Sequence, residues 1–158
     1  MIKIVDQAFS EEDHLSLLGY CRTAPYHYGE RDKAARPPTG LVSEIDSENR
    51  VFMMVASKIL EKFPEIESAS IYRMYVNCFA PGENPYFHVD GKAGYTFLYY
   101  PDESWDRDEG GETQFLIDGE IQGVLPLPNR LVMFDATLLH KATSFRSRHR
   151  FTLAVKCL

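Results

Sequence analysis

The first residues of the chain change from an extended to a helical hydrophobic pattern. Apolar and polar side chains alternate over residues 2–5, which predicts a short strand. Ser10 then offers a helix N-cap, and the three acidic residues that follow it favour the positive end of a helix dipole. Apolar residues continue at helical spacing to about Thr23, where we expect this helix to end.

A second helix is predicted over residues 46–63. Val51, Val55 and Ile59 recur at the spacing of one helical face, and Pro64 ends the run. Between the two helices, residues 24–41 are rich in proline and basic side chains and predict a long loop. A loop of this length is either a functional lid or a solvated connection.

From residue 68 onward the hydrophobic runs become short and alternating, with Gly and Pro between them. This texture predicts strands near residues 69–79, 86–89, 95–100, 113–117, 121–124, 130–135 and 150–157. Many short strands separated by turns are typical of a sandwich or a jelly roll. Because the helices come first and the strands later, the predicted class is α+β.

The length and composition describe an ordinary globular chain of one domain. It has 158 residues, of which 44% are hydrophobic, and this length suffices for one core without disulfides. We therefore expect a single domain over residues 1–158, with the helices in about 1–66 and a β core in about 68–158. The formal net charge of −6 argues against a surface for nucleic-acid phosphates, despite the local cluster Arg146, Arg148 and Arg150.

The cysteines and the absence of long apolar runs bear on the cellular compartment. Cys21, Cys78 and Cys157 are an odd number and far apart, which favours free thiols in a reducing compartment. The first residues lack the apolar core of a signal peptide, and no run is long enough to span a membrane. We expect a cytoplasmic protein without a membrane partner.

Three features carry candidate chemistry, and each is weak alone. His88 and Asp90 lie two apart in a predicted strand, so their side chains share a face and could bind one metal. His140 follows a hydrophobic strand and could point into the mouth of a barrel, although a lone His is more often structural. Arg150 and Thr152 share the less hydrophobic face of the last strand.

Arg150 is the most informative of the basic residues near the end of the chain. An Arg on the inner face of a barrel needs an anionic partner, and its planar guanidinium suits a carboxylate. Arg146 and Arg148 are rivals for this role, but they lie in a turn-like basic stretch, whereas Arg150 begins a hydrophobic strand.

Together the three features are much more specific. Two His and one carboxylate form the facial triad of non-haem Fe(II) oxygenases, which leaves coordination positions open. A chelating 2-oxo acid and O₂ could take these positions, and Arg150 could bind the distal carboxylate of the acid. The sequence therefore predicts a metal site of His88, Asp90 and His140.

At this point the sequence resembles the prolyl 4-hydroxylase branch of the 2-oxoglutarate- and Fe(II)-dependent dioxygenases. Further motifs carry the resemblance besides the triad and Arg150: the run Tyr95–Tyr100, the sequence Gly-Gly-Glu-Thr ending at Thr113, and the stretch 125–134 before the second His. The resemblance covers about Arg73 to Leu158. It implies a double-stranded β-helix core, of the jelly-roll or cupin-like kind, with the N-terminal helices packed against it.

The resemblance also implies roles for individual residues. Arg150 would bind the C5 carboxylate of 2-oxoglutarate, with Thr152 beside it. Tyr100 matches a tyrosine that contacts the same carboxylate in related enzymes, and Tyr99 is its rival. Trp105 and the loop 24–41 are candidates for the substrate cleft. The implied cofactors are Fe(II), 2-oxoglutarate as cosubstrate and O₂, with ascorbate as a further candidate.

The activity that this resemblance implies is hydroxylation of an unactivated C–H, coupled to decarboxylation of 2-oxoglutarate to succinate and CO₂. The favoured substrate is a prolyl residue in a protein or peptide. The alternatives are an oxygenase that acts on a free amino acid, another residue or a small molecule, and a non-catalytic cupin-like binding module. Nucleic-acid demethylation is disfavoured, because Thr152 and Lys156 differ from that branch and the chain is acidic.

Overall fold

The computed structural model describes residues 1–66 and 71–158. Its α-helices are α1 (Glu11–Thr23) and α2 (Arg50–Lys62), and short 3-10 helices occur at η1 (Pro64–Ile66) and η2 (Arg107–Glu109). The strands are β1 (Ile2–Val5), β2 (His27–Tyr28), β3 (Leu41–Glu44), β4 (Ile71–Phe79), β5 (Tyr95–Tyr100), β6 (Thr113–Ile117), β7 (Glu120–Val124), β8 (Arg130–Asp135), β9 (His140–Ala142) and β10 (Arg150–Cys157).

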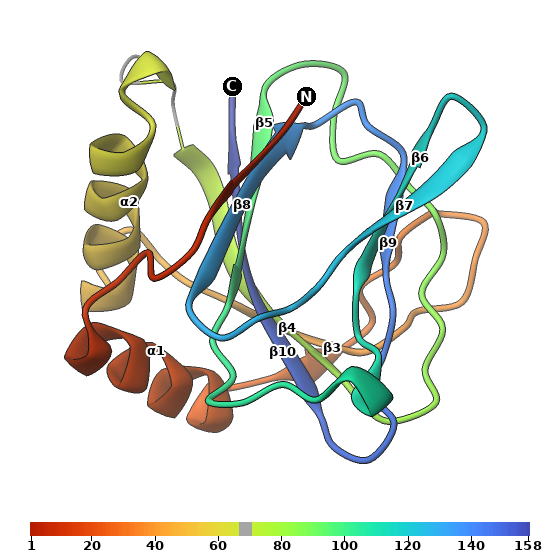
Figure 1. The fold of residues 1–158 in the computed structure, drawn as a ribbon, viewed down its shortest axis with the longest axis horizontal. Helices are drawn as coiled ribbons and strands as arrows, with labels where there is room; N and C mark the ends of the chain where they lie inside the picture. The colour runs from red at the N-terminus through yellow and green to blue at the C-terminus, as the bar shows by residue number, and fades with distance from the viewer. Residues whose placement is uncertain (67–70) are drawn as a thin grey trace.

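The strands form two antiparallel sheets, and the helices cover one of them. The larger sheet has the order β1-β8-β5-β10-β4-β3-β2, and the smaller has the order β7-β6-β9. In Figure 1 both helices lie on one side of the large sheet, and the β6-β7-β9 sheet lies on the other. This arrangement confirms the predicted class, a double-stranded β-helix core with helices packed against it.

The two helices lie close to the predicted positions. The Ser10 side chain caps α1 by accepting a hydrogen bond from the Asp13 backbone N–H at 3.2 Å. Helix α2 begins at Arg50, four residues later than predicted, because Asn49 is its cap. The Asn49 side chain accepts from the Val51 N–H at 2.9 Å, and the residues before it form a turn.

The predicted strands at 2–5, 95–100, 113–117, 130–135 and 150–157 are confirmed with the same bounds. The first two residues of the strand predicted at 69–79 lie outside the described residues. The strand predicted at 86–89 is wrong. Irregular backbone runs there, and only His88 forms an isolated bridge, to His140.

Sequence reasoning also missed short strands, because two to four residues leave too little periodicity to detect. Strand β2 lies inside the predicted loop 24–41, and β3 begins at its last residue. Strands β1 and β3 pair with β8 and β4, so the region before residue 66 supplies parts of the large sheet as well as the helices.

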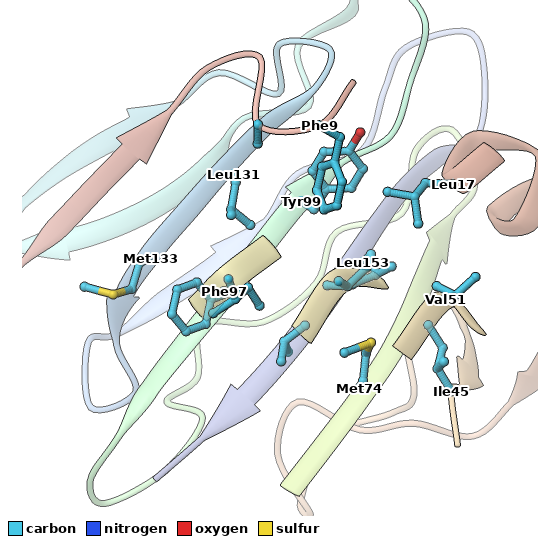
Figure 2. Close-up of a cluster of buried hydrophobic side chains, with 14 of the residues drawn as sticks. Phe9, Leu17, Ile45, Val51, Met74, Phe97, Tyr99, Leu131, Met133 and Leu153 are labelled. Carbon is cyan, nitrogen blue, oxygen red and sulfur yellow. The ribbon is translucent and has the colours of Figure 1, made fainter. Parts of the chain in front are cut away.

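Residues on the outer face of the large sheet pack against the helices. Phe97 and Tyr99 from β5 and Leu153 from β10 point to this side, together with Leu131 and Met133 from β8. Figure 2 shows these side chains gathered with Leu17 and Val51 of the helices. The period of two along each strand sends one set of apolar residues outward to this core.

The alternate residues of the same strands point inward, between the two sheets. Leu98, Tyr100 and Ala154 belong to this second cluster, where Phe115 of the small sheet meets Phe134 of β8 with ring centroids 4.9 Å apart. On β10 the inward set also includes polar residues, and these face the candidate site. No helix of the described part of the chain has the length and apolarity that crossing a bilayer requires.

We expect the outer core to dominate the stability of the fold. Leu153 is fully buried in it, so Leu153→Ala should lower the free energy of unfolding by about 2–5 kcal/mol. Leu15 of α1 is 52% exposed and provides a matched control, whose change to Ala should cost well under about 1 kcal/mol. Urea unfolding of both variants measures the difference, and equal losses would contradict this account of the core.

Candidate active site

The structure brings His88, Asp90 and His140 together. One potential ligand atom from each lies within 4.8 Å of the others. His88 and His140 exchange backbone hydrogen bonds of 2.9 Å in both directions, and the Asp90 N–H donates to the Ala136 carbonyl at 2.9 Å. The irregular segment that carries His88 and Asp90 is thus fixed to the start of β9 by its backbone, without being a regular strand.

Both imidazoles are oriented by backbone carbonyls. His88 Nδ1 lies 2.9 Å from the Tyr86 oxygen, and His140 Nδ1 lies 2.8 Å from the Leu138 oxygen. A carbonyl oxygen only accepts, so each Nδ1 carries a proton, and in the neutral form of each ring the Nε2 lone pair is free for a metal. Outer partners of this kind fix the tautomer and the ring plane of metal-binding His residues. Burial lowers the pKa of His88, but its contacts with Asp90, the Tyr86 carbonyl and Asp32 together raise it.

The Asp90 carboxylate lies between the two rings. His88 Nε2 is 3.5 Å from Oδ1, and His140 Nε2 is 3.5 Å from Oδ2. Thr96 donates its hydroxyl to Oδ2 at 2.6 Å, and the Lys156 ammonium is 2.9 Å from Oδ1. The side chain of Asp90 is only 3% exposed, so these contacts hold a buried carboxylate in one orientation.

These contacts determine the charge states of the cluster. Burial is the largest single influence on the pKa of the Asp90 carboxyl and raises it, but the contacts with His88, His140, Lys156 and Thr96 together lower it more. The pKa therefore lies well below its usual range, and Asp90 is ionised. For His140, burial outweighs the attraction of Asp90 and lowers the pKa, which favours the neutral ring that a metal requires.

Arg150 is a buried cation in the same cavity. It is 1% exposed, and its guanidinium donates to the Gly111 carbonyl at 2.7 Å, to Thr152 Oγ1 at 2.6 Å and to Thr113 Oγ1 at 3.0 Å. All three acceptors are neutral, and within residues 1–66 and 71–158 no carboxylate lies at ion-pairing distance from Arg150. Because a buried charge without a counter-ion is costly, the position is built for an anionic ligand.

Gly111 is required for this arrangement. Its φ of +83° lies in the left-handed region, and a Cβ there would come within 2.3 Å of the Phe145 ring. The glycine therefore lets its carbonyl reach Arg150 while Phe145 packs behind it.

A single cavity of about 280 Å³ connects these groups. Its lining includes the three clustered residues, together with Thr113, Thr152, Lys156 and Arg150. The volume is close to the lower end of the usual range for small-molecule sites. The lining also includes residues of β4 and of the predicted loop 24–41, which contributes Glu30, Arg31, Asp32 and Thr39.

The two candidate tyrosines point in opposite directions. Tyr100 faces inward, with its hydroxyl 2.8 Å from Thr113 Oγ1 and its ring 5.5 Å from the Arg150 guanidinium carbon. Tyr99 faces the helices, and its hydroxyl contacts His14 and Asn129. Of the two, only Tyr100 is on the side of the cavity, and it supports Arg150 through Thr113.

Other predicted residues lie outside the cavity. Trp105 donates its indole N–H to the Gly110 carbonyl at 2.8 Å and does not line the cavity. Arg148 pairs with Asp102 at 3.0 Å, and Arg146 donates to the Asp108 carbonyl at 2.8 Å. The structure thus places Arg150, and neither of its rivals, at the site.

Sequence reasoning overlooked several residues that contact the predicted ones, namely Thr96, Thr113, Asp32 and Lys156. Lys156 had a detectable signal, because it lies on the same face of β10 as Arg150 and Thr152. Thr113 was visible only as part of the Gly-Gly-Glu-Thr motif. Asp32, which accepts the Tyr86 N–H at 2.7 Å, gave no signal because a long loop has no periodicity.

The donor set suits a divalent transition metal with open coordination positions. Two imidazole nitrogens and one ionised carboxylate are available, and the charge of Arg150 is unpaired in the same cavity. Imidazole and carboxylate ligands in this combination are typical of Fe(II), and a dicarboxylate that reaches both the metal and Arg150 would compensate the buried cation. The residues present therefore fit Fe(II) and 2-oxoglutarate.

Comparison with known proteins shows the family. The sequence profile of the 2OG-Fe(II) oxygenase superfamily matches residues 74–155, which is more than half of the chain. The chain therefore belongs to this superfamily and is a 2-oxoglutarate-dependent dioxygenase that uses Fe(II), 2-oxoglutarate and O₂. A search of curated proteins found no significant sequence match.

Solved structures share the fold at low sequence identity. A prolyl-4-hydroxylase from Pseudomonas putida has a TM-score of 0.82 at 16% identity, with 99% of this chain and 91% of that chain covered. A prolyl hydroxylase from Trichoplax adhaerens, in complex with a hypoxia inducible factor peptide fragment, has a TM-score of 0.79 at 14% identity, with 99% of this chain and 83% of that chain covered. A viral collagen prolyl hydroxylase from Paramecium Bursaria Chlorella virus-1, in a 2-oxoglutarate complex, has a TM-score of 0.72 at 15% identity, with 99% of this chain and 94% of that chain covered.

Behind Arg150, the structure contains a buried carboxyl group with a raised pKa. Asp102 is 3% exposed, its Oδ1 accepts from Arg148, and its Oδ2 has no partner among the described residues. Burial raises the pKa of Asp102 to about 6, against the opposing charges of Arg148 and Arg150. The ordinary value is 3.8, so the folded protein holds this proton more tightly than the unfolded chain does.

This shift predicts a pH-dependent effect of Asp102→Asn. The protonated Asp102 carboxyl contributes fully to the free energy of unfolding below about pH 4, and this contribution is lost as pH rises through about 6, because ionisation then favours the unfolded chain. The Asn side chain does not ionise. The free energy of unfolding of the variant, relative to that of the unmodified protein, should therefore rise by about 1 kcal/mol between about pH 5 and about pH 7.5. Urea unfolding of both proteins at the two pH values measures this gain. A stability difference that does not change with pH would show that Asp102 has an ordinary pKa.

Proposed function

We propose that this dioxygenase hydroxylates a prolyl residue in a protein or peptide. The observation that supports the activity most strongly is the unpaired buried charge of Arg150 in one cavity with His88, Asp90 and His140. A non-catalytic binding module has no need for a facial metal cluster and a buried cation in the same small cavity.

In this proposal His88 and His140 bind Fe(II) through Nε2, and Asp90 binds it through a carboxylate oxygen. When bound, Fe(II), 2-oxoglutarate and O₂ supply the oxidising power that hydroxylates an unactivated C–H while 2-oxoglutarate is converted to succinate and CO₂. The tasks of the chain are to bind, to orient and to keep the reaction away from solvent. The backbone carbonyls on each Nδ1 serve orientation, and the burial of Asp90 serves the exclusion of water.

Arg150 binds the distal carboxylate of 2-oxoglutarate in this proposal. Thr152 and Thr113 hold the guanidinium in place, and either hydroxyl can turn to donate to the carboxylate. Tyr100 keeps Thr113 in position through their 2.8 Å hydrogen bond. A planar guanidinium in this frame favours a carboxylate in bidentate geometry.

The substrate assignment is supported by the fold and by the shape of the site. The similar structures named above are prolyl hydroxylases, and one of them holds a peptide fragment. In this chain β4 and the loop that carries Glu30 and Asp32 both line the cavity, and we propose that an extended peptide lies along this part of it. We further propose that the chain forms one domain and acts in the cytoplasm, a location that the three free thiols favour.

The first test is an anaerobic titration with Fe(II) and 2-oxoglutarate, followed by visible absorption. A 2-oxo acid chelated to Fe(II) gives a weak charge-transfer band, which we expect for the unmodified protein. His140→Ala should abolish the band because a metal ligand is lost. Arg150→Met should retain Fe(II) but weaken 2-oxoglutarate binding by about 100-fold or more, because a charge-assisted bidentate contact is removed. Folded protein without a band would refute the proposal.

The second test identifies the substrate. Peptides that each contain one proline are incubated with Fe(II), 2-oxoglutarate and O₂, and tandem mass spectrometry locates any added oxygen. We expect one oxygen on the proline, formed together with an equal amount of succinate. The matched controls are the same peptides with Ala in place of Pro, and free proline. Oxygen added only to free amino acids would assign the enzyme to a small-molecule substrate instead.

A further inference from the structure

Lys156 is the one lysine among the described residues that line the cavity, and its ammonium contacts a proposed metal ligand. It is near the end of β10, on the inward face with Arg150 and Thr152. Its ammonium is 2.9 Å from Asp90 Oδ1, and its side chain is 12% exposed. The pair differs from a surface salt bridge, because both partners are largely removed from water.

The register of the sheet places both donors to Asp90. Lys156 of β10 is the direct cross-strand partner of Thr96 on β5. Thr96 donates to Oδ2 and Lys156 contacts Oδ1, so each carboxylate oxygen has its own donor from adjacent strands. This arrangement fixes the plane of the carboxylate as well as its position.

The two donors differ in what they leave available to a metal. A hydroxyl occupies one lone pair of Oδ2 and brings no net charge. An ammonium on Oδ1 brings a full positive charge, which repels a second cation at the same oxygen. Each oxygen lies 3.5 Å from one imidazole Nε2, Oδ1 from that of His88 and Oδ2 from that of His140, so the charge of Lys156 is what distinguishes them and leaves Oδ2 for a metal.

We propose that Lys156 is a positioning residue that makes Asp90 a ligand through one oxygen only. This inference rests on the proposed function. A facial triad leaves three positions, two for a chelating 2-oxo acid and one for O₂, and a carboxylate that bound through both oxygens would leave none for O₂. By holding Oδ1, Lys156 keeps that third position open, so its removal should leave the binding of Fe(II) and 2-oxoglutarate nearly unchanged and slow the reaction with O₂.

Lys156→Met tests this inference, because it removes the ammonium and keeps a side chain of similar length. Metal binding is measured by anaerobic equilibrium dialysis with Fe(II), chelation by the visible charge-transfer band as 2-oxoglutarate is titrated, and the reaction with O₂ by the decay of that band after rapid mixing with oxygenated buffer. We expect Fe(II) and 2-oxoglutarate to bind within a few-fold of their original affinities, while the decay of the band in O₂ slows ~10-fold or more. Lys156→Arg keeps the charge and should restore most of the decay rate.

The control is Lys62→Met on helix α2, which removes the same charge far from the cavity and should behave like the unmodified protein. If Lys156→Met does not fold, as judged by circular dichroism and thermal unfolding, Lys156→Gln replaces it, because the amide keeps a donor but no charge. Folded variants without the charge whose charge-transfer band decays in O₂ as fast as that of the unmodified protein would overturn the inference. Absence of the band in the unmodified protein would instead overturn the proposed function.

Discussion

The arrangement of the site depends on strand β10, which is hydrogen-bonded to β4 on one side and to β5 on the other. A strand paired along both edges cannot slip without breaking two ladders, and a shift by one residue would exchange its two faces. The outer face carries Leu153 and Val155 into the core beneath the helices. The same register holds Arg150, Thr152 and Lys156 toward the cavity, so the packing of the helices and the chemistry of the cavity are fixed together.

The inward face of β10 has an electrostatic cost that the rest of the cavity offsets only in part. Lys156 has a carboxylate partner, whereas Arg150 has only neutral acceptors. Three hydrogen bonds engage each nitrogen of the Arg150 guanidinium but leave its charge uncompensated, and burial lowers its pKa accordingly. In the proposed function, a dianionic cosubstrate supplies the negative charge that the described residues around Arg150 do not. Stability that is given up at a binding site in this way is recovered as affinity for the ligand.

Local patterns in the sequence were enough to predict the main elements, because alternation and capping are properties of neighbouring residues. The strands around Phe97 and Leu153 and the cap at Ser10 are of this kind. The irregular path of residues 86–90 was not predictable, since it depends on the pairing of His88 with a strand fifty residues away. The contact of Lys156 with Asp90 was not predictable either. It depends on the register between β5 and β10, which no local sequence pattern encodes. Tyr99 and Tyr100 are adjacent in a strand and therefore point to opposite faces of the sheet. Which of them faces the cavity depends on the face that the helices cover, and the local sequence does not encode this.

The part of the cavity that is lined by the loop 24–41 and β4 offers contacts by which a substrate can be recognised. Glu30 pairs with Arg73 at 2.9 Å, and Asp32 accepts hydrogen bonds from the Tyr86 backbone and from Thr39. The loop is therefore held beside β4 by charged and polar contacts, while the cavity lining also includes Val89, which is 50% exposed. A substrate at this wall meets hydrogen-bonding groups and paired charges beside an exposed apolar side chain. In the proposed function, the polar groups suit the backbone amides and carbonyls of an extended peptide and the apolar side chain suits a proline ring, whose own nitrogen has no hydrogen to donate.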